Sequence, residues 1–267
     1  MTGLSDHKAV ILCGGQGTRI RGVADNLPKP LIPIGGKPII WHIMKTYSFY
    51  GIRKFILCLG YKGEEIIDYF ENYHARNHDF TMKVSENDRK RFHNNETDDR
   101  DVDDWEITFA LTGEDTMTGG RVKRIERYID EEEFFCTYGD GVSDINIREL
   151  FEFHKNRKTT ATLTGVHLPT TFGIVETDSS DTITSFREKP VMGGLINGGF
   201  FVFNREIFSN INGDESVLEG VPMKRLLRNK ELVMYRHEGF WQCMDTYKDF
   251  LKLNQMWNSN NAPWKIW

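Results

Sequence analysis

Short apolar stretches alternate with helical patterns along this chain, and no other feature of the sequence constrains its fold as strongly. The apolar stretches are rich in β-branched and aromatic residues and are bounded by glycine or polar residues, as buried strands are. They cover residues 8–13, 54–59, 133–138, 161–167, 198–203 and 232–235. Between them, apolar residues recur at spacings of three and four, which predicts helices over residues 38–50, 64–73 and 147–154. The alternation predicts an α/β fold with a doubly wound, mostly parallel sheet, which binds its ligand beyond the carboxyl ends of the strands.

The composition is that of a globular protein, and we expect a single domain over residues 1–267. Hydrophobic residues make up 39% of the chain and charged residues 27%, with no internal repeat or low-complexity linker. The 34 basic and 39 acidic residues give a net charge of −5. This balance argues against a protein that binds nucleic acid by neutralising phosphates. It leaves open a small anionic ligand, because a local basic cluster can hold a phosphate inside an acidic protein.

The sequence favours a cytoplasmic protein that does not enter the membrane. No apolar run is long enough to span a bilayer, and the polar residues 1–7 lead directly into the first apolar stretch, so no signal peptide is expected. Three of the four cysteines, Cys13, Cys58 and Cys136, lie in apolar runs, and no pair forms a Cys-x-x-Cys. Reduced thiols in the core are therefore expected.

Two stretches differ from the rest of the chain. Residues 85–104 contain few apolar side chains and end in an acidic run, so we expect a solvent-exposed loop or lid rather than an acidic metal site. Residues 257–267 form an aromatic C-terminal tail that contains Trp257, Trp264 and Trp267. Packing of this tail on its own chain or on a neighbouring subunit is favoured over an aromatic ligand cage.

A glycine-rich loop after the first predicted strand is the strongest local indication of a ligand. After Leu12 and Cys13 the chain reads Gly14-Gly15-Gln16-Gly17-Thr18-Arg19. Glycines let backbone N–H groups approach a polyphosphate closely, and Arg19 adds a fixed positive charge. For the glycines alone, a plain tight turn remains the alternative. The spacing matches neither the Rossmann nor the Walker loop, which argues against an NAD-dependent oxidoreductase.

Three charged residues in unusual surroundings strengthen this indication. Lys29 lies between two prolines that stiffen the chain, which distinguishes it from an ordinary surface lysine. Asp140 lies between glycines after a predicted strand, and Asp245 lies in an apolar run where an unpaired carboxylate would be costly. Two aspartates with phosphate oxygens and waters form a common Mg²⁺ site. Each aspartate alone is equally typical of a helix cap or a turn.

Together these motifs resemble those of the sugar-1-phosphate nucleotidylyltransferases, and among them those of the cytidylyltransferases that use glucose 1-phosphate. Besides the glycine-rich loop, the shared motifs are Pro28-Lys29-Pro30, Met117-Thr118-Gly119-Gly120-Arg121, Tyr138-Gly139-Asp140-Gly141, Glu188-Lys189-Pro190 and Ile196-Asn197-Gly198-Gly199. Residues 35–45, 239–242 and 262–265 share the family's sequence as well. The resemblance covers nearly the whole chain, so the set is specific where one motif would be weak. It implies a Rossmann-like nucleotidyltransferase fold with a small subregion for sugar binding and oligomerisation.

For the nucleotide, the resemblance implies a site that binds CTP. The glycine-rich loop would wrap the triphosphate, and Thr116 and Arg121 would help to select the cytosine ring. Arg19 and Lys29 would neutralise phosphates. The implied nucleotide-binding residues are Leu12, Gly14, Gly15, Gly17, Thr18, Arg19, Lys29, Thr116, Arg121 and Gly139.

For the sugar 1-phosphate, the resemblance implies that Lys189 binds the phosphate. Glu188 and Asn197, with the backbone at Gly173 and Gly198, would receive the sugar hydroxyls. Asp140 and Asp245 would hold Mg²⁺, and the implied catalytic residues are Arg19, Lys29, Asp140 and Lys189. The resemblance also implies a homo-oligomer whose product, CDP-glucose or a related CDP-sugar, feeds cell-surface polysaccharide or deoxysugar synthesis.

The chain departs from the family mainly on the sugar side. Leu27 replaces the first lysine of a Lys-Pro-Lys-Pro motif, Thr170 and Thr171 lie where the family has an arginine before Phe-Gly, and Cys243 replaces a proline. The segment between Lys189 and Asn197 is shorter than usual. The resemblance is therefore firmer for cytidylyl transfer than for glucose as the acceptor. A different phosphorylated acceptor, UTP in place of CTP, and a non-catalytic sugar-nucleotide-binding regulatory module remain alternatives.

Overall fold

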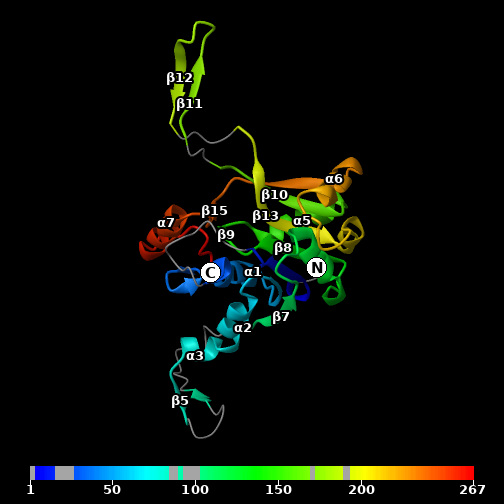
Figure 1. Cartoon of the computed structure of the whole chain (residues 1–267), viewed down its shortest axis with the longest axis vertical. Coiled ribbons are helices and arrows are strands. Elements are labelled where there is room, and N and C mark those ends of the chain that lie inside the picture. Colours follow the sequence, from blue (N-terminus) through cyan, green and yellow to red (C-terminus); the bar gives the residue numbers. More distant parts are fainter. Residues whose placement is uncertain (1–3, 16–26, 84–89, 93–102, 169–171, 189–192) are drawn as a thin grey trace.

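A seven-stranded sheet forms the centre of the molecule in the computed structural model, which describes residues 4–15, 27–83, 90–92, 103–168, 172–188 and 193–267 (Figure 1). Its strand order is β14-β10-β13-β8-β1-β4-β7. In chain order the strands are β1 (Lys8–Leu12), β4 (Lys54–Leu59), β7 (Glu106–Leu111), β8 (Glu133–Tyr138), β10 (Ala161–Val166), β13 (Ile196–Asn204) and β14 (Leu232–His237).

The sheet is mostly parallel and reverses its winding beside β1, as the alternation of strands and helices predicts. Strand β1 pairs in parallel with β4 on one side and with β8 on the other. Strand β4 continues in parallel to β7, and β10 pairs in parallel with β14. Only β13 is antiparallel to its neighbours, β8 and β10. The chain therefore winds outward on both sides of β1, and the crevice between the carboxyl ends of β1 and β8 is the favoured ligand position.

Helices cover both faces of the sheet, so its inner strands are buried on both sides. Alternate residues of β1 belong to two different cores: Ala9 and Ile11 face one layer, and Val10 and Leu12 face the other. The first layer contains α1 (Ile39–Phe49), α5 (Ile147–Arg157) and α7 (Tyr247–Asn258). The second contains α4 (Thr118–Arg124), the 3₁₀ helix η4 (Arg205–Asn210) and α6 (Val221–Arg228).

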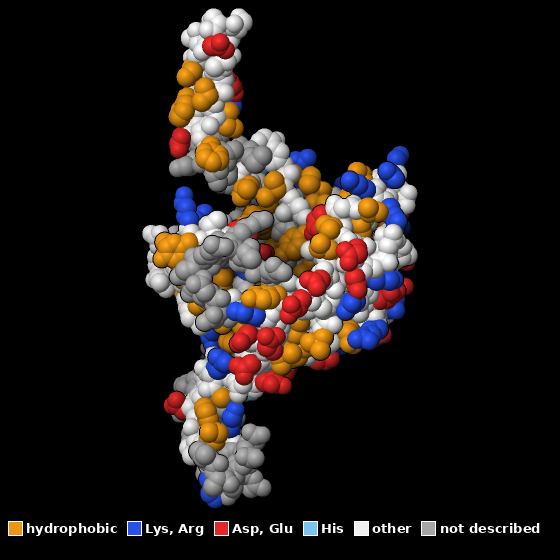
Figure 2. Space-filling model, in the orientation of Figure 1, with side chains coloured by type: hydrophobic (Ala, Val, Ile, Leu, Met, Phe, Trp, Pro, Cys, Tyr) orange, Lys and Arg blue, Asp and Glu red, His pale blue; other side chains and the backbone are white. Residues whose placement is uncertain are grey.

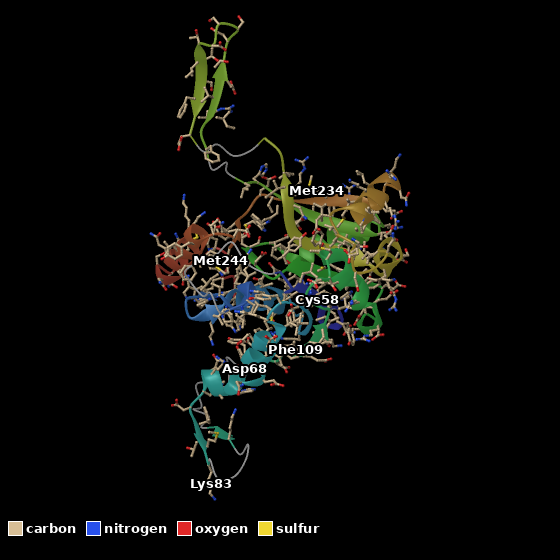
Figure 3. The ribbon with its side chains drawn as sticks, viewed as in Figure 1. Cys58, Asp68, Lys83, Phe109, Met234 and Met244 are labelled. Atoms are coloured by element: carbon tan, nitrogen blue, oxygen red, sulfur yellow. The ribbon has the colours of Figure 1, made fainter. Side chains whose placement is uncertain are left out.

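Buried side chains crowd around the sheet, and the buried Cys58 lies on β4, next to the edge strand β7 (Figure 3). All four cysteines are free, and the three in apolar runs are buried, as predicted. Within the described part of the chain, no helix is both long enough and apolar enough to cross a membrane.

The predicted helix over residues 64–73 is wrong in one respect, because the structure divides it into α2 (Gly63–Glu71) and α3 (Tyr73–Asn77).

The smaller elements are η1 (Leu4–Asp6), η2 (Lys29–Leu31), β2 (Pro33–Ile34), β3 (Lys37–Pro38), η3 (Glu126–Tyr128), β9 (Gly141–Ser143) and β15 (Trp241–Cys243).

Two antiparallel hairpins extend away from the body of the molecule at opposite ends (Figure 1). One consists of β11 (Ile174–Thr177) and β12 (Ile183–Arg187), and the other of β5 (Phe80–Met82) and β6 (Lys90–Phe92). Strand β6 falls within the predicted exposed stretch 85–104, most of which lies outside the described residues.

At the end of that stretch, Asp103 corrects the expectation of solvent exposure. Its side chain is only 5% exposed. It accepts hydrogen bonds from Trp41 Nε1 at 2.8 Å and Tyr73 Oη at 2.6 Å, and it forms an ion pair with Lys45 at 2.9 Å. Asp103 therefore anchors the start of β7 to α1 and α3, because a buried carboxylate needs such partners.

The aromatic tail packs against its own chain. Trp264 is fully buried, stacks on Phe240 and Trp257, and approaches His42 Nδ1 with its indole nitrogen at 3.4 Å. Burial lowers the pKa of His42 to about 4, so this side chain is neutral at pH 7. The tail is thus part of the core on the α1 face of the sheet.

Candidate active site

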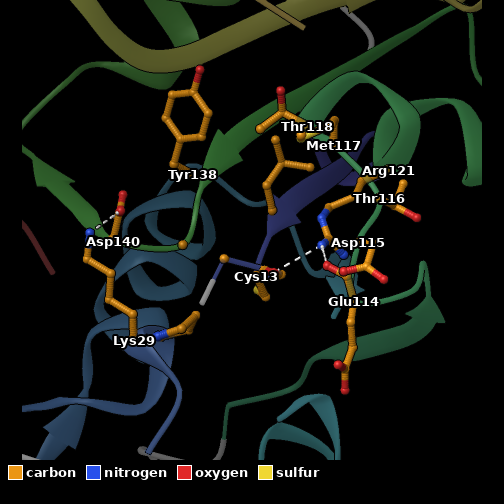
Figure 4. Close-up of a pocket in the computed structure, with 15 residues that line it drawn as sticks. Cys13, Lys29, Glu114, Asp115, Thr116, Met117, Thr118, Arg121, Tyr138 and Asp140 are labelled. Atoms are coloured by element: carbon orange, nitrogen blue, oxygen red, sulfur yellow. Dashed lines mark hydrogen bonds and ion pairs between the residues drawn. The ribbon is translucent and has the colours of Figure 1, made fainter. Parts of the chain in front are cut away.

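A pocket of about 410 Å³ opens where β1 and β8 end (Figure 4). Its walls come from the first turn after β1, from η2, from the segment before α4 and from the end of β8. The lining residues are Leu12, Cys13, Gly14, Gly15, Lys29, Pro30, Glu114, Asp115, Thr116, Met117, Thr118, Arg121, Tyr138, Gly139 and Asp140. The pocket therefore lies at the crevice that the strand order favours.

Most of the residues that the sequence suggests for the nucleotide meet in this pocket. Those that line it are Leu12, Gly14, Gly15, Lys29, Thr116, Arg121 and Gly139, and they are joined by Asp140, which the sequence suggests for the metal ion. Gly17, Thr18 and Arg19 lie outside the described residues.

Gly139 packs closely against its neighbours: a Cβ there would approach Leu12 O to 3.1 Å and Pro30 Cγ to 3.2 Å. A side chain at this position would disturb the junction of β1 and β8.

Arg121 is built into the pocket wall. It is 4% exposed, and its Nη1 donates to Leu59 O, Thr112 Oγ1 and Gly113 O, at 2.8 to 3.1 Å. Its Nη2 donates at 3.0 Å to Gly14 O and to Glu114 O. Burial lowers the pKa of this guanidinium.

The same packing explains Gly14, because a Cβ there would overlap the guanidinium of Arg121. Arg121 thus connects the glycine-rich loop to the segment before α4.

Asp140 and Asp245, far apart in the sequence, are brought together by a short strand pairing. Strand β9, which follows Asp140, pairs antiparallel with β15, which precedes Asp245. Met244 N donates to Asp140 O at 2.8 Å and closes this junction. The two carboxylates then share one cation, Lys29. Its Nζ lies 2.6 Å from Asp140 Oδ2 and also forms an ion pair with Asp245 Oδ1.

The ionic state of Lys29 follows from these neighbours. Burial alone would lower the pKa of the ammonium group, but the two carboxylates outweigh this effect and the pKa is raised. Lys29 is therefore charged at neutral pH. A protonated amine held between two carboxylates shows that the geometry suits a cation.

The residues present fit a divalent metal ion. Asp140 and Asp245 supply hard oxygen ligands that converge on one position, which the Lys29 ammonium marks. Among the residues that the structure describes, no group of three His, Cys, Asp or Glu side chains converges on a metal position. A metal ion held here would therefore take its other ligands from substrate phosphates and water, as Mg²⁺ does with nucleotides.

The residues suggested for the sugar lie outside the set that lines the pocket and form two groups. Gly173 and Glu188 lie together at the base of the β11–β12 hairpin, where a Cβ at Gly173 would be 3.0 Å from Glu188 Oε2. Asn197 and Gly198 lie at the start of β13, and Gly198 O accepts a hydrogen bond from Trp241 Nε1 at 2.7 Å. Lys189 lies outside the described residues.

Sequence reasoning missed several residues of the pocket, of which Tyr138 is the most informative. It precedes the Gly139-Asp140 motif, and its position at the end of a predicted strand was the available signal. Burial, with the nearby Glu219 carboxylate, raises the pKa of Tyr138, so its hydroxyl stays protonated. Met117, Thr118, Glu114 and Asp115 complete the wall opposite Tyr138 (Figure 4).

Comparison with known proteins assigns the chain to a family. A family model described as nucleotidyl transferase matches residues 8–259. The chain belongs to the nucleotidyl transferase family. It is 44% identical to the probable glucose-1-phosphate cytidylyltransferase of Bacillus subtilis, over 97% of this chain and 100% of that protein. It is also 44% identical to the glucose-1-phosphate cytidylyltransferase of Salmonella typhi, over 97% of this chain and 99% of that one.

Solved structures agree on the fold. HddC from Yersinia pseudotuberculosis superposes with a TM-score of 0.66 at 22% identity, over 94% of this chain and 99% of that chain. These relatives confirm the predicted fold and the predicted enzyme class of this nucleotidyl transferase. Enzymes of this family generally use a divalent metal ion, together with a nucleoside triphosphate and a sugar 1-phosphate.

Proposed function

We propose that this nucleotidyl transferase forms CDP-glucose, or a related CDP-sugar, and pyrophosphate from CTP and a sugar 1-phosphate. The observation that carries the proposal is the Asp140–Lys29–Asp245 cluster, which lies at the edge of a nucleotide-sized pocket at the carboxyl ends of β1 and β8. The relatives at 44% identity support glucose 1-phosphate and CTP as the substrates, because their names state this activity.

The proposed reaction is a direct displacement. An oxygen of the sugar phosphate attacks the α-phosphorus of CTP, and the bond to the bridging oxygen of pyrophosphate breaks on the opposite side. A phosphate monoester has a second pKa of about 6, so the attacking group is already mostly a dianion at pH 7. No general base is needed, and the work of the protein is to position two anions and offset their charge.

The residues of the chain divide this work. Lys29 would neutralise the triphosphate, as would Arg19 in the glycine-rich loop, and Lys189 would bind the phosphate of the acceptor. Asp140 and Asp245 would hold Mg²⁺, which when bound supplies charge neutralisation at the phosphates. Thr116 and Arg121 would shape the site for cytosine. Glu188, Asn197, Gly173 and Gly198 would bind the sugar.

A homo-oligomer in the cytoplasm is part of the proposal. The β11–β12 hairpin exposes five large apolar side chains along its length (Figure 2). They are Phe172, Ile174, Val175, Ile183 and Phe186. Exposed apolar patches of this kind mark protein interfaces, and a second copy is the partner that the resemblance implies. The free, buried thiols support a reducing compartment.

Light scattering with size-exclusion chromatography tests the oligomer. We expect the Ile183→Ser/Phe186→Ser double variant to dissociate where the wild-type protein remains associated. Leu227→Ser, which removes an exposed leucine from α6, is the matched control and should not change the mass. Dissociation by the control alone, or by neither variant, would place the interface elsewhere.

A pyrophosphate-release assay tests the reaction. CTP, UTP, GTP, ATP and dTTP are each combined with a panel of sugar 1-phosphates, and we expect the highest kcat/KM for CTP with glucose 1-phosphate. A preference for UTP or for another acceptor would support the corresponding alternative. Failure to release pyrophosphate with any pair would indicate the non-catalytic module. Isolation of a stable cytidylylated protein from CTP alone would rule out the direct displacement.

A further inference from the structure

A chain of hydrogen bonds connects the nucleotide side of the pocket with the start of β13. Thr118 Oγ1, at the beginning of α4, donates to Glu219 Oε2 at 2.9 Å. The Tyr138 hydroxyl donates to the other oxygen of the same carboxylate. Asn197 Nδ2 donates to the Tyr138 hydroxyl oxygen at 3.2 Å. In Figure 4 the Tyr138 and Thr118 hydroxyls point to the same side of the pocket. Both hydroxyls donate to the carboxylate of Glu219.

The Tyr138 ring is held firmly, so its hydroxyl has a fixed position. The ring forms part of the pocket wall and packs edge-on against Phe201 at a centroid distance of 5.8 Å. On another side it lies against the backbone of Gly199, where a Cβ would overlap the ring. Gly199 also has a φ of +77°, which a residue with a side chain rarely adopts. A glycine at this position is what allows the ring to lie against β13.

Glu219 determines which way the Tyr138 hydroxyl points. A carboxylate only accepts hydrogen bonds, so the phenolic proton must point toward it. The lone pairs of the hydroxyl oxygen are then available to Asn197.

The amide of Asn197 is held at both ends. Its Nδ2 donates to Tyr138, and its Oδ1 accepts from Gly199 N at 2.9 Å. An amide has two donor hydrogens and a carbonyl oxygen with two lone pairs, so one donor and one acceptor site remain. This remaining pair matches a sugar hydroxyl, which is both a donor and an acceptor.

We propose that Tyr138 is a positioning residue for the sugar acceptor: oriented by Glu219, its hydroxyl fixes the amide of Asn197 for the sugar hydroxyls. The proposal rests on the proposed function, in which Asn197 binds the sugar. It adds Tyr138 and Glu219, whose replacement should weaken binding of the sugar 1-phosphate rather than of CTP. Through Thr118, the same carboxylate connects this arrangement to the segment that forms the nucleotide wall.

Steady-state kinetics of Tyr138→Phe test the proposal. Phenylalanine keeps the ring that lines the pocket and removes only the hydroxyl. We expect the KM for the sugar 1-phosphate to rise about 5- to 10-fold, as for the loss of one hydrogen-bonded contact, while kcat and the KM for CTP change less than about twofold. Tyr128→Phe, in η3, is the matched control and should change neither KM.

Glu219→Ala provides a second route to the same result, because Glu219 is an exposed residue whose removal does not affect the core. It leaves the Tyr138 hydroxyl free to rotate, so the KM for the sugar 1-phosphate should rise by a similar factor. The double variant Tyr138→Phe/Glu219→Ala should be no worse than the poorer single variant, because both changes remove the same support from Asn197. Multiplication of the two effects would mean that the residues act independently and would overturn the proposal.

The outcomes separate this proposal from the proposed function. The comparison uses whichever sugar 1-phosphate the wild-type enzyme accepts. If the wild-type enzyme turns over but Tyr138→Phe leaves the acceptor KM unchanged, or shifts only the KM for CTP, the role of Tyr138 is overturned. The proposed reaction is then unaffected. A wild-type protein that neither turns over nor binds any sugar 1-phosphate, as measured by calorimetry, overturns both.

Discussion

The central sheet and the β11–β12 hairpin contain similar residues in opposite surroundings. Strand β8 is flanked by β1 and β13 and covered by both helix layers, so Phe134, Phe135 and Cys136 are fully buried. In the hairpin each strand pairs only with the other, and Phe186 and Ile183 are 63% and 61% exposed. A two-stranded hairpin is marginally stable by itself. Burial, and not residue type, therefore makes the first region a scaffold and leaves the second exposed.

Replacement of one phenylalanine in each region gives the largest expected difference. Phe135 packs against the rings of Tyr47 and Phe151 and is completely buried. We expect Phe135→Ala to lower the free energy of unfolding by about 3–5 kcal/mol, because it removes buried surface and leaves a cavity. Phe186→Ala should change the free energy of unfolding of the dissociated subunit by less than about 0.5 kcal/mol. Urea denaturation measures both, and similar losses would mean that the hairpin shares the stability of the core.

In the range where histidines titrate, from about pH 7 to 4, the pH dependence of stability should come from the body, because residues 172–188 of the hairpin contain no histidine. His42 has a native pKa of about 4 against about 6.5 in an unfolded chain. Below pH 6.5 the unfolded state binds a proton that the native state does not. Stability is thus lost as the pH falls from about 6.5 to 4, by about 3 kcal/mol in total at 1.36 kcal/mol per pH unit.

Urea denaturation from pH 7 to pH 4.5 tests whether stability falls with the pH. The change in the free energy of unfolding per pH unit should be smaller in His42→Gln than in the wild-type protein, whatever the absolute stability of the variant. An unchanged slope would assign the pH dependence to other groups.

Replacement of an aspartate by asparagine should lower activity in the pocket and leave it unchanged in the hairpin. Asp140→Asn weakens the cation site, and we expect kcat to fall about 100-fold, equivalent to about 2.7 kcal/mol. Asp178→Asn alters a fully exposed turn between β11 and β12, where the side chain accepts bonds from Ser180 and Thr182, and should keep normal turnover. Asp245→Asn should behave like Asp140→Asn. Near-normal turnover in both pocket variants would contradict the metal assignment.

The smallest expected effect is the difference in stability between variants of two adjacent pocket glycines, Gly14 and Gly15. Gly14→Ala forces a Cβ into the guanidinium of Arg121, and we expect a loss of about 2 kcal/mol in unfolding free energy, as for other overpacked sites. Gly15→Ala meets no atom within 4 Å and should leave stability nearly unchanged. Thermal denaturation of both variants provides the comparison. Equal losses would show that backbone freedom, rather than the contact with Arg121, requires these glycines.

Local sequence was sufficient for the buried strands. Strands β4 and β8 have the bounds that their apolar runs predict, because residues buried on both faces leave a continuous signal. Strand β7 was not predicted. It lies at the edge of the sheet, and its mixed residues Glu106 and Thr108 hide the signal. The helix predicted over residues 64–73 is divided at Asn72, for which periodicity gives no warning.

The sequence by itself determined the fold class, through the alternation of strand and helix patterns. It determined the family and about half of the pocket residues through short motifs such as the loop at Gly14 and Gly15. Only the tertiary structure decided which motifs meet. The pairing of β9 with β15 brings Asp245 to Asp140 and Lys29. Packing also places Arg121, which the sequence suggests for the cytosine ring, in buried contact with Gly14 O of the glycine-rich loop. Such contacts join residues distant in the chain, and local spacing carries no information about their distance in space.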